Sequence, residues 1–124
     1  MKKETRAAKK ILIVEDNRDL CFIIELLLGK DNVSVDHVKS LSDAKGHLEE
    51  EKADLIVLDN RLPDGLGLDF IPFIKSTYPD ARIMMISGQD NAASDIALEN
   101  GADLFLSKPF TRDQLEKSVK SLLN

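Results

Sequence analysis

Short continuous apolar runs alternate along the chain with longer stretches in which apolar residues recur every three or four positions. The short runs, rich in β-branched residues, predict strands buried on both faces. They cover residues 11–14, 33–38 (a weaker, alternating pattern), 55–58, 82–86 and 104–106. The longer stretches predict helices at about residues 18–29, 41–51, 68–78, 90–100 and 111–123.

Polar residues mark where several of these helices begin. Asp16 or Asn17 can cap the first helix, and Ser40 opens a pattern like a capping box before the second. Thr111 and Gln114 form another capping box before the last helix. Strands that alternate with helices predict a parallel sheet covered by helices on both faces. We therefore predict an α/β, flavodoxin-like (βα)5 fold with strand order 2-1-3-4-5.

Length and charge narrow the class of protein further. The 124 residues fit one domain, which we place at residues 10–124 after a basic N-terminal tail at residues 1–9. The net charge of −5 argues against direct binding to nucleic acid or to an anionic membrane. No apolar run approaches membrane-spanning length. The single cysteine excludes an internal disulfide, and we expect a cytoplasmic protein.

Polar side chains follow the predicted strands at their carboxyl ends, where open α/β sheets bind their ligands. The first strand ends in Glu15 and Asp16, and the third ends in Asp59. Ser87 follows the fourth strand and Lys108 follows the fifth. Because the first and third strands are neighbours in the predicted order, their carboxylates meet in one crevice. They repel one another there unless a cation neutralises them.

The chemistry of this group favours a metal and a phosphoryl group. Mg²⁺ suits a site with a few carboxylates completed by water. Lys108 adds a positive charge and Ser87 a hydroxyl, so the group can bind a phosphoryl group and spread its charge. A carboxylate can also act as the nucleophile and form an aspartyl phosphate. Asp59 considered alone has a simpler interpretation, in which it caps the following turn.

Four motifs stand in order at these strand ends. They are Val14-Glu15-Asp16-Asn17, Leu58-Asp59-x-x-Leu62-Pro63-Asp64-Gly65-x-Gly67-Leu68, Met85-Ile86-Ser87-Gly88 and Gly101-Ala102-Asp103-x-Phe105-x-x-Lys108-Pro109-Phe110. Together they resemble the receiver domain of bacterial two-component response regulators, over residues from about 10 to 123. Each motif alone is common, whereas the ordered set is specific.

The resemblance implies a phosphorylation site with a bound metal. Asp59 is then the residue that accepts a phosphoryl group from a phosphohistidine on a sensor kinase. Asp16 is implied as a direct Mg²⁺ ligand, and Glu15 as one that acts mainly through water. Asp59 itself and the backbone carbonyl of Arg61 complete the implied metal site.

The resemblance also implies a switch. Ser87 matches the hydroxyl that turns toward the phosphoryl oxygen, Lys108 the lysine that contacts it, and Phe105 the aromatic that turns inward. The implied output face consists of the fourth helix, the fifth strand and the fifth helix. Arg61 and Gln89 flank the site at positions that tune the phosphoryl lifetime, and we expect slow loss of phosphate.

The implied partners are a sensor histidine kinase or a phosphotransfer protein, with a receiver homodimer as a further assembly. Such a domain assists its own phosphorylation and dephosphorylation but is not a conventional enzyme. The chain ends one helix after Lys108, so we expect either a stand-alone receiver or part of a longer regulator. The alternative function is a degenerate receiver that acts as a scaffold without phosphorylation.

Two other classes fit the residues less well. Phosphatases of the haloacid dehalogenase type have a second aspartate two residues after the nucleophile, where this chain has Arg61. A flavodoxin-like nucleotide binder needs a Gly-rich or Ser/Thr-rich loop after the first strand. This chain has Glu15-Asp16-Asn17 there, which repels a phosphate unless a metal intervenes.

Three side chains outside the site have simple interpretations. We expect His37 and His47 to be surface residues that bind no metal, and Cys21 to be a packing residue because no basic neighbour lowers its pKa.

The first helix has more apolar residues than one core stripe needs. Leu20, Ile23, Ile24, Leu27 and Leu28 form the expected stripe. Phe22 and Leu26 remain on the outer face and form a candidate docking patch for a kinase helix.

Overall fold

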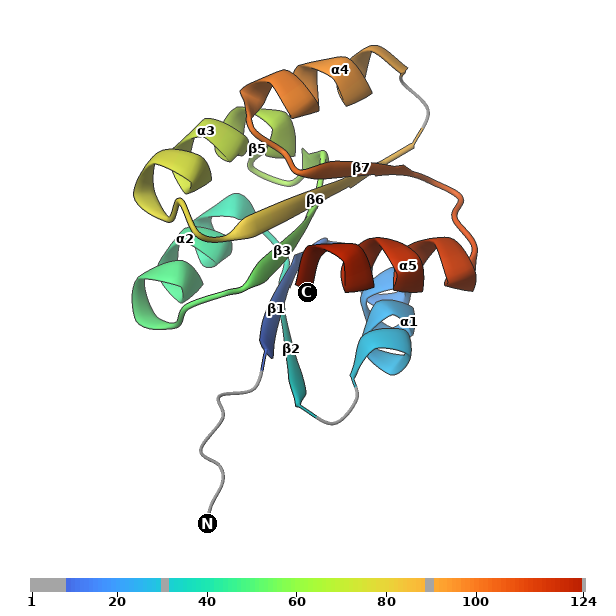
Figure 1. Ribbon diagram of the computed structural model, residues 1–124. Helices are drawn as coiled ribbons and strands as arrows, with labels where there is room; N and C mark the ends of the chain where they lie inside the picture. The colour runs from blue at the N-terminus through green and yellow to red at the C-terminus, as the bar shows by residue number, and fades with distance from the viewer. Residues whose placement is uncertain (1–8, 30–31, 89–90, 124) are drawn as a thin grey trace.

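A computed structural model describes residues 9–29, 32–88 and 91–123 of the chain. Its main sheet has five parallel strands in the order β2-β1-β3-β6-β7 (Figure 1). These strands are β1 (Lys9–Val14), β2 (Val33–Val38), β3 (Leu55–Asp59), β6 (Arg82–Ser87) and β7 (Leu104–Ser107). The predicted order 2-1-3-4-5 is therefore confirmed, because β4 and β5 belong to a separate small hairpin.

Helices cover both faces of the sheet (Figure 1). They are α1 (Arg18–Leu28), α2 (Leu41–Glu50), α3 (Gly67–Thr77), α4 (Asn91–Asn100) and α5 (Arg112–Leu123). Alternate residues of β1 face opposite layers, as the two-residue period of a strand requires. Leu12 and Val14 pack with residues of α2, α3 and α4, whereas Ile11 and Ile13 pack with α1 and α5.

The predicted caps hold the starts of three helices. Asn17 Oδ1 accepts a hydrogen bond of 3.1 Å from the backbone N–H of Leu20, so Asn17 rather than Asp16 caps α1. Ser40 caps α2 through its hydroxyl. Thr111 and Gln114 bond reciprocally through side chain and backbone, at 2.9 and 3.1 Å, and form the expected capping box of α5.

Pro72 lies inside α3 rather than in its first turn. In the structure, Pro72 is the residue whose N–H would otherwise bond the Leu68 carbonyl oxygen. That oxygen instead accepts a hydrogen bond of 3.3 Å from the side-chain amide of Asn100, the last residue of α4. A side chain of α4 thus supplies the hydrogen bond that the proline removes from α3.

The segment after β3 is more ordered than the predicted loop. Arg61–Leu62 (β4) and Gly65–Leu66 (β5) pair antiparallel around the turn at Pro63 and Asp64. Gly65 has φ of +152°, a conformation that favours glycine. The predicted basic tail lies outside the described residues except for Lys9, which begins β1. Among the helices that the structure describes, none has both the length and the apolar character needed to cross a membrane.

Candidate functional site

Three carboxylates meet where β1 and β3 end. Glu15 and Asp59 are buried, at 1% and 6% exposure, whereas Asp16 is exposed to solvent. One oxygen from each of the three lies within 4.8 Å of the others. The convergence predicted from the strand order is therefore present, and it places two buried negative charges side by side.

Lys108 supplies a positive charge between the two buried carboxylates. Its Nζ lies 3.2 Å from Glu15 Oε1 and 3.2 Å from Asp59 Oδ1. The backbone N–H of Lys108 donates to the Ser87 carbonyl oxygen at 2.8 Å, which ties the loop after β7 to the end of β6. A single ammonium thus contacts carboxylates from β1 and β3 while its own backbone is held by β6.

Burial and charge shift the protonation of this group in identifiable directions. Burial is the main reason that the pKa of Glu15 is raised, and repulsion from Asp59 adds to it, against the opposing effects of the Asn17 N–H and Lys108. Burial alone lowers the pKa of Lys108, but Asp59 and Glu15 outweigh it, and its pKa is raised overall. The lysine therefore stays charged, and the negative charge of the site remains only partly compensated.

The donor set fits a hard divalent cation. All three groups that converge here, Glu15, Asp16 and Asp59, offer carboxylate oxygens, which are the ligands that Mg²⁺ prefers. The three carboxylates carry a formal charge of −3, and Lys108 offsets only one of these charges. A divalent cation therefore still meets a net negative charge at the site. Asp16, the exposed member, is the one that solvent reaches directly.

Backbone hydrogen bonds fix the position of Glu15. Its N–H donates to the Val38 carbonyl oxygen at 3.0 Å, and its Oε2 accepts from the Asn17 N–H at 3.1 Å. The Cys21 thiol donates to the Glu15 carbonyl oxygen at 3.4 Å. The carboxylate is thus oriented by Asn17, the residue that caps α1.

Asn60 is a structural residue of the site that the sequence reasoning missed. Its backbone oxygen accepts from the Gly67 N–H at 2.8 Å, and its Oδ1 accepts from the Leu68 N–H at 3.1 Å. It therefore caps the start of α3 from across the hairpin. The available signal was an asparagine directly after Asp59, since asparagine is a preferred capping residue.

Asp64 at the tip of the hairpin also caps a helix. Its two carboxylate oxygens accept from the backbone N–H groups of Leu41 and Ser42, each at 2.9 Å. These two bonds hold the pKa of Asp64 below its ordinary value. No local sequence pattern could reveal this contact, because the partners are 22 and 23 positions away.

The remaining predicted residues differ in their exposure to solvent. Ser87 is buried at the end of β6, and Phe105 is half-buried against the layer formed with α2, α3 and α4. Arg61 is exposed on the hairpin. Gln89 lies outside the described residues.

Comparison with known families identifies the family to which this chain belongs. The family model of the response regulator receiver domain matches residues 11–120 of the chain. The chain belongs to this family. Receiver domains are signalling domains of two-component systems, and the five-strand order found here is that of a CheY-like fold.

Related regulators are longer than this chain. The receiver domain is 34% identical over 93% of its length to the response regulator protein PilR of Pseudomonas aeruginosa, of which it covers 26%. It is 33% identical over 90% of its length to the transcriptional regulatory protein KdpE of Staphylococcus aureus, of which it covers 48%. The chain thus spans about a quarter to a half of the curated relatives it matches.

Solved structures of receiver domains superpose closely on this chain. The beryllofluoride-activated NtrC4 receiver domain dimer has a TM-score of 0.87 and 30% identity, with coverage of 92% of this chain and 95% of that one. A two-component response regulator from Clostridium difficile has a TM-score of 0.86 and 28% identity, with coverage of 93% and 95%.

Two expectations for α1 have different outcomes. Cys21 is buried at 1% exposure, and burial together with nearby carboxylates raises its pKa to about 12, in keeping with a packing residue. Ile23, assigned above to the core stripe, is wrong in that role because it is 48% exposed. It extends the exposed pair Phe22 and Leu26 into a three-residue patch on the outer face of α1.

Neither histidine is a plain surface residue. Both are half-buried, which differs from the expectation for His37 and His47. His37 Nε2 is buried without a hydrogen-bond partner in the described part of the chain. His47 Nε2 lies 3.5 Å from Asp36 Oδ2, on the α2 side of the sheet.

Proposed function

We propose that this receiver domain is a phosphorylation-dependent switch in which Asp59 accepts a phosphoryl group. The observation that carries the proposal is the position of Asp59: it is buried beside Glu15 and Asp16, and its Oδ1 is 3.2 Å from Lys108 Nζ. A carboxylate that only capped a turn would need neither the acidic neighbours nor the lysine.

Mg²⁺ is the proposed cofactor, held by Glu15, Asp16, Asp59 and the backbone carbonyl of Arg61. When bound, the ion supplies charge neutralisation for a phosphoryl group that approaches three carboxylates. The all-oxygen donor set supports this choice. Asp16, exposed at the rim, is proposed as a direct ligand, and Glu15 as one that acts mainly through water.

The proposed reaction joins an Asp59 oxygen to phosphorus while the bond from phosphorus to the donor's histidine nitrogen breaks. The electron pair of that bond stays with the leaving imidazole, and the product is an acyl phosphate on Asp59. Lys108, already placed beside Asp59, would shift its contact from the carboxylate to the new phosphoryl oxygens. Hydrolysis of the acyl phosphate, assisted by the same site, would reset the switch.

The signal is proposed to leave through Ser87, Phe105 and Lys108. Phosphorylation adds roughly −1.5 to −2 charges, which attract the Ser87 hydroxyl and the Lys108 ammonium. The bond between the Lys108 N–H and the Ser87 carbonyl couples their two loops. Phe105 lies in register with Met85, two residues before Ser87, so it can follow the movement of β6 and alter the face formed by α4, β7 and α5.

We propose a sensor histidine kinase or a phosphotransfer protein as the donor, meeting the domain in the cytoplasm. The exposed patch of Phe22, Ile23 and Leu26 on α1 is a candidate contact for it. A receiver dimer is a further proposed assembly, supported by the dimeric, beryllofluoride-activated NtrC4 receiver domain. Arg61 and Gln89 are proposed to tune the lifetime of the phosphoryl group.

Intact-mass measurement with acetyl phosphate tests the central step. The wild type should gain one phosphoryl group in Mg²⁺ and none in EDTA, whereas Asp59→Asn should gain none in either. The matched control is Asp69→Asn, which removes an exposed carboxylate from the first turn of α3 and should leave the gain intact. A gain that persists in Asp59→Asn would contradict the proposed acceptor.

Failure of the wild type to gain mass from acetyl phosphate or from any phosphohistidine donor would favour the scaffold function.

The rate at which the phosphorylated wild type and phosphorylated Arg61→Ala lose the phosphoryl group tests the tuning role. We expect faster loss in the variant, because the exposed arginine on the hairpin then no longer shields the group from water. Equal half-lives would exclude Arg61 from that role.

A further inference from the structure

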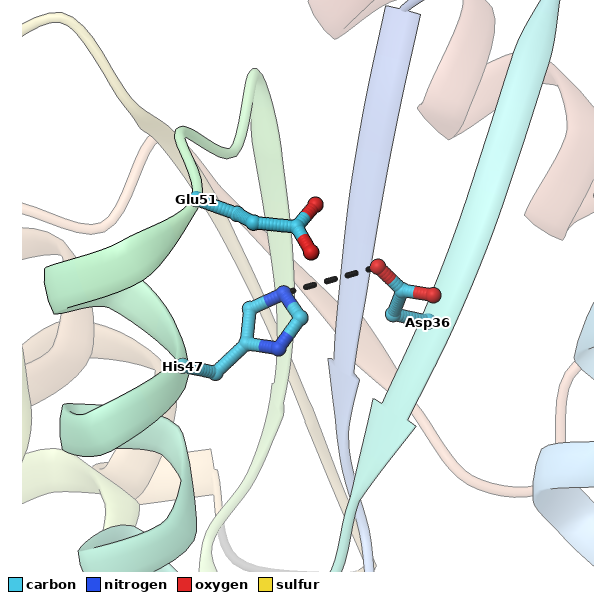
Figure 2. A group of neighbouring side chains, drawn as sticks. All are labelled: Asp36, His47 and Glu51. Carbon is cyan, nitrogen blue, oxygen red and sulfur yellow. Dashed lines mark ion pairs between the residues drawn. The ribbon is translucent and has the colours of Figure 1, made fainter.

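A second group of metal-ligating side chains lies away from the Asp59 site. Figure 2 shows Asp36 on β2 with His47 and Glu51 from α2 and its C-terminal end, all directed toward one another. A ligand atom from each lies within 4.8 Å of the others. Asp36 pairs with Leu12 in the middle of β1, so this group lies along the sheet rather than at its carboxyl edge.

We propose that Asp36, His47 and Glu51 form a binding site for one Zn²⁺ ion at the seam between the edge strand β2 and helix α2. The site is independent of the proposed phosphorylation. It joins one nitrogen donor to two carboxylates, all of them ligand types that zinc accepts, and a water would complete the tetrahedron that zinc prefers.

The spacing of two of the donors fits a shared ion as well as a direct ion pair. His47 Nε2 and Asp36 Oδ2 are 3.5 Å apart, which is longer than the usual 2.7–3.2 Å of an N–H···O hydrogen bond. Two ligands about 2.0–2.1 Å from a tetrahedral zinc ion stand about 3.4 Å apart. The histidine and the aspartate therefore already have the separation that a common zinc ion requires.

The backbone fixes the two helix-borne ligands relative to each other. The Glu51 N–H donates to the His47 carbonyl oxygen at 2.9 Å, and Glu51 is the C-cap residue of α2. This bond holds the backbone of Glu51 one turn beyond His47, at the end of the helix. Asp36 opposes them from an edge strand, where a side chain has room to adjust.

The site has a charge that a divalent ion can balance, and its side chains are partly exposed to solvent. Two carboxylates and a neutral imidazole sum to −2, which a divalent ion balances. Glu51 Oε1 lies 3.6 Å from Lys10 Nζ, but both side chains are nearly half exposed, so this pair is a weak competitor. The imidazole nitrogen also distinguishes the site from the all-oxygen Asp59 site, because imidazole favours Zn²⁺ over Mg²⁺.

Isothermal titration calorimetry with ZnCl₂ tests the proposal on untagged protein in excess Mg²⁺. The wild type should bind one Zn²⁺. Loss of even an outer-shell partner weakens metal sites about 10–100-fold, so His47→Gln and Glu51→Gln should each bind at least about tenfold more weakly. His37→Gln is the matched control, because His37 lies on the same strand as Asp36 but next to it in sequence and therefore on the other sheet face; its affinity should not change.

Two further measurements keep the test valid if a variant misfolds or if the phosphorylation proposal fails. In wild-type protein, the Nε2 resonance of His47 should shift on addition of Zn²⁺ while the resonances of His37 stay in place. Asp59→Asn should bind Zn²⁺ as the wild type does. The proposal is overturned if wild-type protein binds no Zn²⁺, if His47→Gln binds it equally well, or if the His47 resonance does not move.

Discussion

At the scale of single residues, Gly67 shows how closely the backbone is packed beside the carboxylate cluster. A Cβ at this position would overlap the Asp59 carbonyl oxygen and would lie 3.0 Å from both Leu58 Cγ and Met85 Cε. The start of α3 can approach the end of β3 only because this residue has no side chain. The position of Asp59 thus depends on the absence of atoms at Gly67.

Gly67→Ala should destabilise the domain by about 1–3 kcal/mol, the usual cost of overpacking. It should also slow phosphorylation by acetyl phosphate, since the displaced backbone is that of Asp59. Gly46→Ala is the matched control: nothing lies within 4 Å of a Cβ there, and alanine should stabilise the interior of α2 by about 0.5–1 kcal/mol. Urea unfolding of both variants measures the contrast, and equal effects would contradict it.

Cys21 gives a second prediction at this scale. The thiol is 1% exposed and its pKa is raised to about 12 by burial and by nearby carboxylates. Because the thiolate is the reactive form, the native protein should react with a thiol reagent such as DTNB far more slowly than the urea-unfolded chain at pH 8. Comparable rates in the two states would contradict a buried, protonated thiol.

At the scale of elements, helices are completed by residues from other parts of the chain. Asn100 of α4 bonds the Leu68 carbonyl that Pro72 leaves free in α3. Asp64 on the hairpin caps α2, although Ser40 already caps it locally. These contacts connect neighbouring helices without adding to the apolar core.

The hydrogen bond from Asn100 to the Leu68 carbonyl should contribute more to stability when Pro72 is present. Asn100→Ala should destabilise the wild type by about 1 kcal/mol, because the Leu68 carbonyl then lacks its donor. In a Pro72→Ala background the backbone N–H of the new alanine supplies that bond, so the same change should cost less. A double-mutant cycle by urea unfolding measures the coupling, and additive effects would show that the two positions do not share the carbonyl.

The cap from Asp64 should depend on pH. Its pKa is lowered, so its stabilisation is present above the ordinary value of 3.8 and is lost as the pH falls through the lowered value. The wild type should therefore be more stable than Asp64→Ala at neutral pH, and the difference should shrink as the pH falls below 3.8. Thermal unfolding between pH 7 and pH 2 measures this difference, and a constant gap would exclude titration of Asp64.

Local signals explain which elements could be predicted from the sequence. The buried strands and the caps at Ser40 and Thr111 depend on neighbouring residues, and they were predicted correctly. The turn residues Pro63, Asp64 and Gly65 were recognised, but the short hairpin around them was not, because each strand has only two residues. Ile23 was placed in the core because the sequence does not reveal how few residues of α1 are buried against the sheet.

Convergence of the site was predictable, whereas contacts between its elements were not. The strand order alone brings Glu15 and Asp59 together, since the carboxyl ends of parallel strands share one edge. The encounter of Asp36 with His47 depends on how α2 lies against the edge strand, which no local pattern specifies.

At the scale of the whole molecule, one lysine connects several strands at the site. Lys108 joins the segment after β7 to β1 and β3 through Glu15 and Asp59, and to β6 through its backbone. Strands that enter the sheet far apart in sequence therefore share one cation. Any metal ion that binds the carboxylates would compete with the Lys108 ammonium for their oxygens.

Lys108→Ala should destabilise the metal-free protein, because the buried carboxylates of Glu15 and Asp59 then repel each other without compensation. Mg²⁺ should restore more stability to this variant than to the wild type, since the ion then replaces the positive charge that Lys108 supplied. Urea unfolding with Mg²⁺ or EDTA measures both effects. An equal gain from Mg²⁺ in the two proteins would contradict this account.

The order of the strands also bears on how this protein behaves at high concentration. Strands β2 and β7 form the two open edges of the sheet, where free backbone groups can recruit another chain. Strand β7 has only four residues, and β2 carries the acidic side chain of Asp36 near its middle. Short length and charge are both features that discourage edge-to-edge aggregation. Both edges of the sheet therefore carry features that resist unregulated pairing with another chain.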